Sequence, residues 1–199
     1  MRGKLDFLVA GVGGQGTVLA SDILAEVGVA AGYDVKKSDV LGLAVRGGSV
    51  LSHVRWGEEV ASPVVPRGGA DYLLGFEPLE ALRGVEYLSP ASTALVNAHP
   101  IPPVSVSSGG ADYPSLDRIE SSLAEAARRT LLVDATAAAR AAGSVRAANV
   151  ALLGALSTLI DVPEEVWREV VERRVPAKYQ RLNLDAFQAG RGMMNGGTR

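Results

Sequence analysis

A glycine-rich segment near the N-terminus has the spacing of an anion-binding turn. Gly11, Gly13 and Gly16 form the pattern G-x-G-x-x-G, with Gly14 and Gln15 inside it. Small residues before a helix let an anion approach the main-chain N–H groups, where the helix dipole favours negative charge. The segment therefore predicts a site for a nucleotide or another anion. Because the chain has 23 glycines, a purely structural turn is the alternative.

A dinucleotide-binding turn also needs an acidic residue about 20 positions later, at the end of the second strand, to hold a ribose. Two residues compete for this role: Asp34 at the start of the expected strand and Asp39 near its end. Lys36 and Lys37 lie between them. The pattern therefore favours anion binding in general over NAD in particular.

A second candidate is the segment Arg46, Gly47, Gly48 and Ser49. An arginine fork beside two glycines and a hydroxyl suits a phosphate or a carboxylate. The alternative is that the glycines open a bend while Arg46 pairs with an acid.

Residues that usually carry catalysis are few. His53 lies within an expected strand, where we expect a hydrogen-bonded packing residue, and His99 precedes a proline and receives no role. Glu77 and Glu80 could pair on one helix face, but the helix dipole alone also favours acids in a first turn. The sequence has no nucleophile elbow, Walker A lysine or HExxH motif. No catalytic residue is predicted.

The chain has no cysteine and two histidines. This excludes disulfides, thiolate zinc sites, cysteine-bound iron–sulfur clusters and multi-histidine metal sites. No metal ligand is predicted, and any metal or redox chemistry in which the protein takes part needs another subunit.

Charge and hydropathy exclude two further classes. The net charge of −2, from 20 basic and 22 acidic residues, lacks the basic excess of nucleic-acid-binding domains. No apolar run reaches the roughly 18 residues of a membrane span, and residues 7–10 are too short for a signal peptide. We expect a cytoplasmic protein. The mean hydropathy of +0.16 suggests a partner, with 41–45 and 101–106 as exposed apolar segments.

The elements around the two glycine segments predict the fold. A strand over 5–10, a helix over 17–31 and a strand over 33–40 open a parallel α/β sheet. A strand over 49–56 followed by a turn and a return from Val60 predicts a β-hairpin. Further strands are expected over 71–75, 93–97 and 130–134, and helices over 77–88, 116–127, 135–142, 148–160, 163–175 and 185–189.

The proline-rich segment 99–114 is expected to be a loop, with an extended piece at 104–107. The fold class is α/β: a Rossmann-like, mostly parallel sheet with flanking helices and an inserted β-hairpin. Residues 1–190 form one domain, and the glycine-rich residues 191–199 form a flexible tail.

Taken together, these motifs resemble a known family. The sequence resembles the gamma-type domain of 2-oxoacid:acceptor (ferredoxin) oxidoreductases, and is most similar to the beta (small) subunit of the indolepyruvate type. The resemblance extends from about Phe7 to Gly190, and at Val45 the sequence departs from the family's usual glutamine. The resemblance rests on these segments: 11–17, 38–39, 46–50, 77–81, Asn149, 152–155, Asn183, 186–187 and Gly190.

The resemblance implies a reaction in which a 2-oxoacid and coenzyme A give an acyl-CoA, CO₂ and reduced ferredoxin. It implies that thiamine diphosphate and the [4Fe-4S] clusters belong to a large catalytic (alpha) subunit. This chain would be a non-redox subunit, inactive alone, whose two glycine segments face the phosphates of coenzyme A or thiamine diphosphate.

Two other functions remain open from the sequence. One is a freestanding nucleotide-binding enzyme that uses the first glycine segment in the Rossmann manner. The other is a ligand-binding module without a redox partner. A homodimer and the identity of the 2-oxoacid also stay open.

Overall fold

A computed structural model describes residues 3–42 and 46–195. Its centre is a six-stranded sheet in the order β2-β3-β1-β4-β5-β6. The strands are β1 (Leu5–Val12), β2 (Asp34–Leu41), β3 (Ser49–Gly57), β4 (Tyr72–Gly75), β5 (Thr93–Asn97) and β6 (Arg129–Val133). The β1, β4, β5 and β6 strands pair in parallel, while β3 pairs antiparallel with both β1 and β2.

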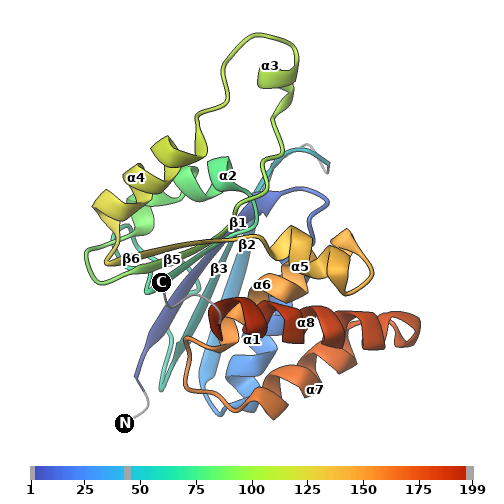
Figure 1. Cartoon of the computed structure of the whole chain (residues 1–199). Helices are drawn as coiled ribbons and strands as arrows, with labels where there is room; N and C mark the ends of the chain where they lie inside the picture. The colour runs from blue at the N-terminus through green and yellow to red at the C-terminus, as the bar shows by residue number, and fades with distance from the viewer. Residues whose placement is uncertain (1–2, 43–45, 196–199) are drawn as a thin grey trace.

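Helices cover both faces of the sheet (Figure 1). The helices are α1 (Thr17–Ala30), α2 (Pro78–Arg83), α3 (Val104–Ser107), α4 (Leu116–Ala126), α5 (Ala135–Ala141), α6 (Ala148–Ser157), α7 (Glu164–Arg174) and α8 (Gln180–Asn195). One-turn 3₁₀ helices occur at Val85–Tyr87, Val145–Ala147 and Ala177–Tyr179. The larger core lies between the sheet and α1, α5, α6, α7 and α8, and the smaller core lies under α2 and α4.

The β1 strand shows why the sheet is buried on both faces. Phe7 and Val9 point into the larger core, and Leu8 and Ala10 point into the smaller one. A run that is apolar at every position suits a central strand of a sheet with helices on both sides. The α/β class and the mostly parallel sheet are thereby confirmed.

The β-hairpin differs from the expectation. The strand β3 pairs with β2, and residues from Val60 onward form no return strand. Val60 instead donates its N–H to the Asp34 carboxylate (2.8 Å), which fixes the chain after β3 beside the start of β2. The inserted hairpin is therefore β2–β3.

Three further expectations need correction. The segment at 104–107 is the one-turn helix α3, not an extended piece. The expected helix 77–88 divides at Gly84 into α2 and a 3₁₀ turn. The last helix is α8, which continues through Arg191 because that side chain bonds to Ser157 (2.7 Å) and Glu164 (3.1 Å). Residues 191–195 are thus helical, and 196–199 lie outside the described residues.

The expected exposed apolar segments are confirmed in part. Leu41 and Val104 are 59% and 82% exposed, whereas Ile101 and Val106 are half-buried. Val45, with the rest of 43–45, lies outside the described residues. Within 3–42 and 46–195, no helix is both long and apolar enough to cross a membrane.

Candidate functional site

The first glycine segment forms the turn between β1 and α1. Gly14 and Gly16 have φ angles of 105° and 78°, in the left-handed region that favours glycine. A Cβ on Gly11 would lie 2.5 Å from Thr17 Oγ1, so the turn is also tight. Gln15 holds it from inside: its amide oxygen accepts from Val12 N (2.8 Å) and its amide nitrogen donates to Phe76 O (2.9 Å). Gln15 thus serves to position the turn.

This turn leaves the N-terminus of α1 uncompensated. Gly16 is the capping residue and has no side chain to accept from the first N–H groups, and the first turn holds no acidic residue. The Thr17 hydroxyl is buried there and has no hydrogen-bond partner in the described part of the chain. Unpaired donors at the positive end of a helix dipole can bind an anion.

The second glycine segment lies directly against the first. Gly13 N donates to Gly48 O (2.7 Å), and Gly47 N donates to Gly13 O (3.1 Å). The structure thus joins the two predicted segments into one surface through β3, which returns antiparallel beside β1. The Arg46 side chain is exposed and pairs with no acid within 3–42 and 46–195. It is free to meet an anion from outside the chain.

Ser49 is engaged elsewhere. Its hydroxyl donates to the Glu80 carboxylate (2.5 Å), which also pairs with Arg83 (2.6 Å). Glu77 caps α2 by accepting from Glu80 N (2.9 Å). The two glutamates therefore follow the helix-terminus interpretation, and they do not form a catalytic pair. Glu80 also connects the second glycine segment to α2, and Glu77 connects residues 98–115 to the same helix.

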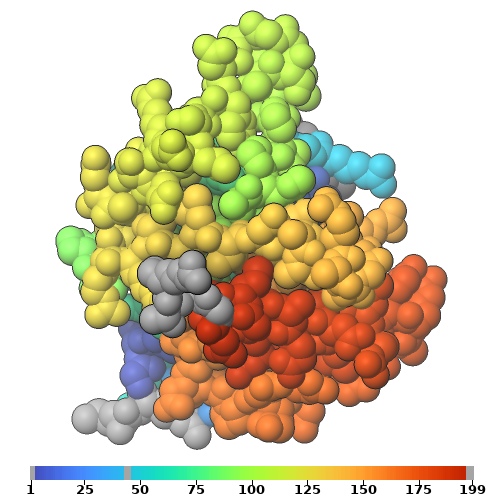
Figure 2. Space-filling model, in the orientation of Figure 1, coloured from blue at the N-terminus to red at the C-terminus, as the bar shows by residue number. Residues whose placement is uncertain are grey.

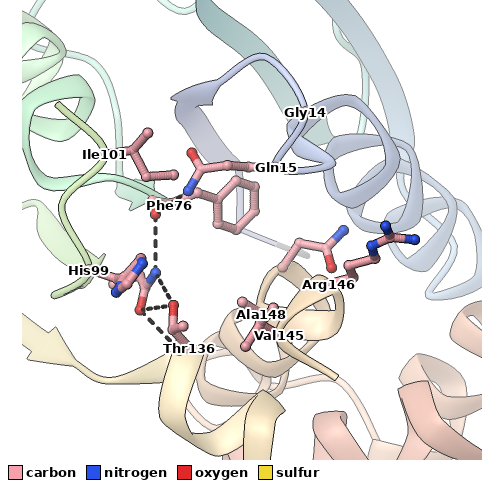
Figure 3. Close-up of a pocket in the computed structure, with 11 residues that line it drawn as sticks. Gly14, Gln15, Phe76, His99, Ile101, Thr136, Val145, Arg146 and Ala148 are labelled. Carbon is pink, nitrogen blue, oxygen red and sulfur yellow. Dashed lines mark hydrogen bonds between the residues drawn. The ribbon is translucent and has the colours of Figure 1, made fainter. Parts of the chain in front are cut away.

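A cavity of about 220 Å³, lined by both polar and apolar side chains, opens on one side of Gly14 (Figure 3). Its lining includes Asn97, Thr136 and Asn149. The Asn97 amide donates to the Thr136 hydroxyl (3.0 Å), and the Asn149 amide donates to Gly16 O (3.3 Å). His99 and Arg146 are exposed on opposite sides of it in this view. This cavity was not predicted from the sequence because its lining residues are far apart along the chain. The one signal that could have indicated the cavity is that the carboxyl ends of parallel strands meet at one edge of the sheet, where ligands bind.

A second hollow, of about 390 Å³, lies on the other side of Gly14. It is lined mainly by apolar and glycine residues: Val12, Gly13, Gly14, Gly16, Thr17, Val18, Leu41, Gly42 and Val50. The glycine turn thus lies between a cavity with polar and apolar walls and a more apolar hollow. This arrangement suits a ligand that is anionic at one point and less polar beside it.

Neither acid of β2 is placed to hold a ribose. Burial alone would raise the pKa of Asp39, but hydrogen bonds from Lys37 (2.6 Å) and Ser52 (2.5 Å) outweigh it and hold the pKa below its ordinary value. Asp34 is held by Lys36 and Val60. The β3 strand also lies between β2 and β1, so these two strands are about 9.6 Å apart, twice the spacing of neighbouring strands. The glycine turn and an acid of β2 are therefore not placed to bind the pyrophosphate and the ribose of one NAD molecule.

His53 has the packing role predicted for it. It is 3% exposed, its Nδ1 accepts from Val65 N (3.3 Å), and its ring meets Tyr87 edge-on. Burial lowers the pKa of His53. Within the described residues, no group of three or more His, Cys, Asp and Glu side chains could hold a metal ion.

Comparison with known proteins identifies relatives of this chain. The chain is 42% identical over 190 residues to indolepyruvate oxidoreductase subunit IorB of Thermococcus kodakarensis, covering 94% of each chain. The gamma subunit of a keto/oxoacid ferredoxin oxidoreductase of Geobacter sulfurreducens matches at TM-score 0.68 and 25% identity, over 98% of this chain and 100% of that one.

A third likeness is one of fold alone. A 2-oxoglutarate:ferredoxin oxidoreductase of Magnetococcus marinus, with 2-oxoglutarate, coenzyme A and succinyl-CoA bound, matches at TM-score 0.77 and 22% identity. The match covers 100% of this chain and 32% of that one. The model of the pyruvate ferredoxin/flavodoxin oxidoreductase family matches residues 6–193. The chain therefore belongs to this family.

Proposed function

We propose that this chain is the small, non-redox subunit of an indolepyruvate-type 2-oxoacid:ferredoxin oxidoreductase. The carrying observation is the 42% identity to an indolepyruvate oxidoreductase subunit IorB over 94% of both chains. The complex would convert indolepyruvate, or a related aryl pyruvate, and coenzyme A to acyl-CoA and CO₂ while it reduces ferredoxin.

The chain's own side chains do not fit the redox cofactors. With no cysteine, it cannot bind a cysteine-ligated [4Fe-4S] cluster. We therefore assign the clusters and thiamine diphosphate to a large catalytic (alpha) subunit, through which electrons reach ferredoxin. The assembled complex would be cytoplasmic.

The glycine surface supports a second part of the proposal. Gly13, Gly14 and Gly16 open the N-terminus of α1, and beside them Arg46 supplies a guanidinium that pairs with no acid in the described part of the chain. A Cβ at Gly14 or Gly47 would meet no atom of the described residues within 4 Å, so there is space for a ligand above the turn. These residues would bind a phosphate of coenzyme A, or of the thiamine diphosphate of the partner subunit. Gln15 and Ser49 would only hold the turn and the loop in place.

The alternative of a freestanding nucleotide enzyme has less support. It needs an acid at the end of β2 to reach a ribose, and Asp39 is already bound by Lys37 and Ser52. It also predicts micromolar NAD binding by the isolated chain, which a titration would measure directly.

The first test is an anaerobic pull-down of the tagged chain from its native cytosol, followed by mass spectrometry. We expect a stoichiometric, brown, cysteine-rich and thiamine-dependent partner. Recombinant large subunit should then reduce ferredoxin with indolepyruvate and coenzyme A only after this chain is added. A chain that emerges alone and colourless, together with a large subunit fully active without it, would contradict the proposal.

A further inference from the structure

The segment between β5 and α4 leaves the body of the protein as an arm (Figures 1 and 2). We define the arm as residues 102–111, with α3 near its end. Every hydrogen bond that the arm makes within the described residues stays inside it, as from Val106 N to Pro103 O (3.0 Å) and from Gly110 N to Ser105 O (2.8 Å). The arm is thus folded locally and does not pack back onto the sheet.

One buried carboxylate holds both ends of the arm. Glu77, 1% exposed, accepts from Ile101 N (3.1 Å) where the chain enters the arm. The same oxygen accepts from the Tyr113 hydroxyl where the chain leaves. The Tyr113 oxygen in turn accepts from Leu79 N (3.2 Å). Burial and the Glu77 carboxylate raise the pKa of Tyr113, so its hydroxyl remains a donor. A compact loop closed at its base in this way is frequently functional.

The surface of the arm is uncharged and presents one highly exposed valine. The sequence of 102–111 is PPVSVSSGGA and has no acidic, basic or histidine residue, although charged residues make up 21% of the chain. Val104 is 82% exposed, the highest value among the large exposed hydrophobic residues described. Pro102 and Pro103 restrict the backbone, so less conformational entropy is lost when the arm is bound. The arm is therefore preorganised to enter an apolar, uncharged site.

The position of the arm indicates which partner supplies that site. Ile101 at its base also lines the cavity beside Gly14, so the arm rises next to the glycine surface that we propose faces coenzyme A or the large subunit's thiamine diphosphate. An interface has about 20–30 residues a side, two to three times the length of the arm. The arm is thus one anchor of a larger contact, as expected in a complex with a larger subunit.

We propose that the arm inserts Val104 and its neighbours into an uncharged apolar groove of the large catalytic subunit, and that Glu77 and Tyr113 hold it in the inserting position. This inference rests on the proposed function and adds the anchor by which the two subunits associate.

The test measures the dissociation constant of the full-length chain for the large subunit by anaerobic analytical ultracentrifugation. We expect Val104→Asp to weaken binding roughly 30-fold or more, the size of an interface hot spot. The matched control is Val64→Asp, in a loop near the Arg55 side chain, at a residue 51% exposed. It should bind within about twofold of the wild type. Circular dichroism should show both variants folded, since both sites are exposed.

The outcomes separate the two proposals. If the wild type does not bind the large subunit, the proposed function and this inference both fail. If the wild type binds and Val104→Asp binds equally well, the arm is not an anchor and this inference alone fails. If Val104→Asp instead weakens only self-association of the isolated chain, the groove belongs to a second copy and this inference is overturned.

Discussion

Gly154 of α6 and Gly190 of α8 lie at reciprocal points of one helix contact. A Cβ on Gly154 would overlap the carbonyl oxygen of Phe187, and a Cβ on Gly190 would overlap that of Ala151. The two main chains therefore touch where each helix lacks a side chain. This close approach keeps α6 buried throughout its length and brings its N-terminus, with Asn149, to the glycine turn.

Gly190→Ala should strongly destabilise the fold. The added methyl would overlap the main chain of Ala151, which cannot move aside as a flexible side chain could. We expect a loss of about 3 kcal/mol or more in the free energy of unfolding, measured by urea denaturation. Gly192→Ala is the matched control in the same helix, because a Cβ there meets nothing within 4 Å. It should stabilise by about 0.5–1 kcal/mol. A Gly190→Ala protein as stable as the control would refute the contact.

The stability of the protein should fall in mild acid because of His53. Burial lowers its pKa below the ordinary value of 6.5, so the unfolded chain takes up a proton that the folded chain does not. This contribution to stability is present above pH 6.5 and is lost as the pH falls, by up to about 1.4 kcal/mol per pH unit. Urea denaturation between pH 7.5 and 5.5 would measure it.

His53→Asn should flatten this pH dependence, since an amide oxygen can replace Nδ1 as acceptor from Val65 N but does not titrate. His99→Asn is the control, because His99 is exposed and is the other of the chain's two histidines. It should leave the slope unchanged. An unaltered slope in His53→Asn would show that another group is responsible.

Arg46→Ala should raise the apparent coenzyme A requirement of the assembled enzyme roughly tenfold, with a smaller effect on the maximal rate. The reason is the loss of a charge-assisted bond to a phosphate, which contributes about 1.5–3 kcal/mol. Steady-state ferredoxin reduction at varied coenzyme A would measure it. Arg67→Ala removes another exposed guanidinium, one paired with Glu86, and should have no effect. An unchanged requirement in Arg46→Ala would count against the anion role.

Tyr113→Phe should loosen the arm without unfolding the body. The change removes one of the donors to buried Glu77 and should lower stability by about 1–3 kcal/mol. We expect several-fold faster cleavage within 102–111 by a broad-specificity protease at low concentration. Tyr179→Phe is the control, since Tyr179 is 45% exposed, lies away from Glu77 in the sequence and packs its ring against Lys178 (4.8 Å). Equal cleavage rates in the two variants would show that Glu77 does not hold the arm through Tyr113.

The local parts of the site were predictable from the sequence. The apolar strand, glycine turn and helix over 5–31 follow from patterns within one short window, and the structure has all three in this order. Their hydrogen bonds to each other were not predictable. They depend on β3 lying antiparallel beside β1, and the alternation of 49–57 predicts a strand without specifying its partner.

Tertiary packing decided the other differences. Gly190 and Gly192 predict the end of a helix, yet α8 continues past both. Gly190 packs against the main chain of Ala151, and Arg191 forms an ion pair with Glu164. The cavity beside Gly14 was not predicted for a related reason. Asn97, Thr136 and Asn149 are ordinary at their own positions, and they gain significance only when the sheet brings them to one edge.

The strand β3 also determines the order in which the chain can assemble as it leaves the ribosome. Because β3 lies between β1 and β2, the first 41 residues contain two strands that cannot pair with each other. The β2–β3 hairpin, joined through residues 42–48, makes local contacts that form quickly, whereas pairing with β1 closes a longer loop. We therefore expect the hairpin to form before it docks on β1, so that the two glycine segments come together only after residue 57 has been synthesised.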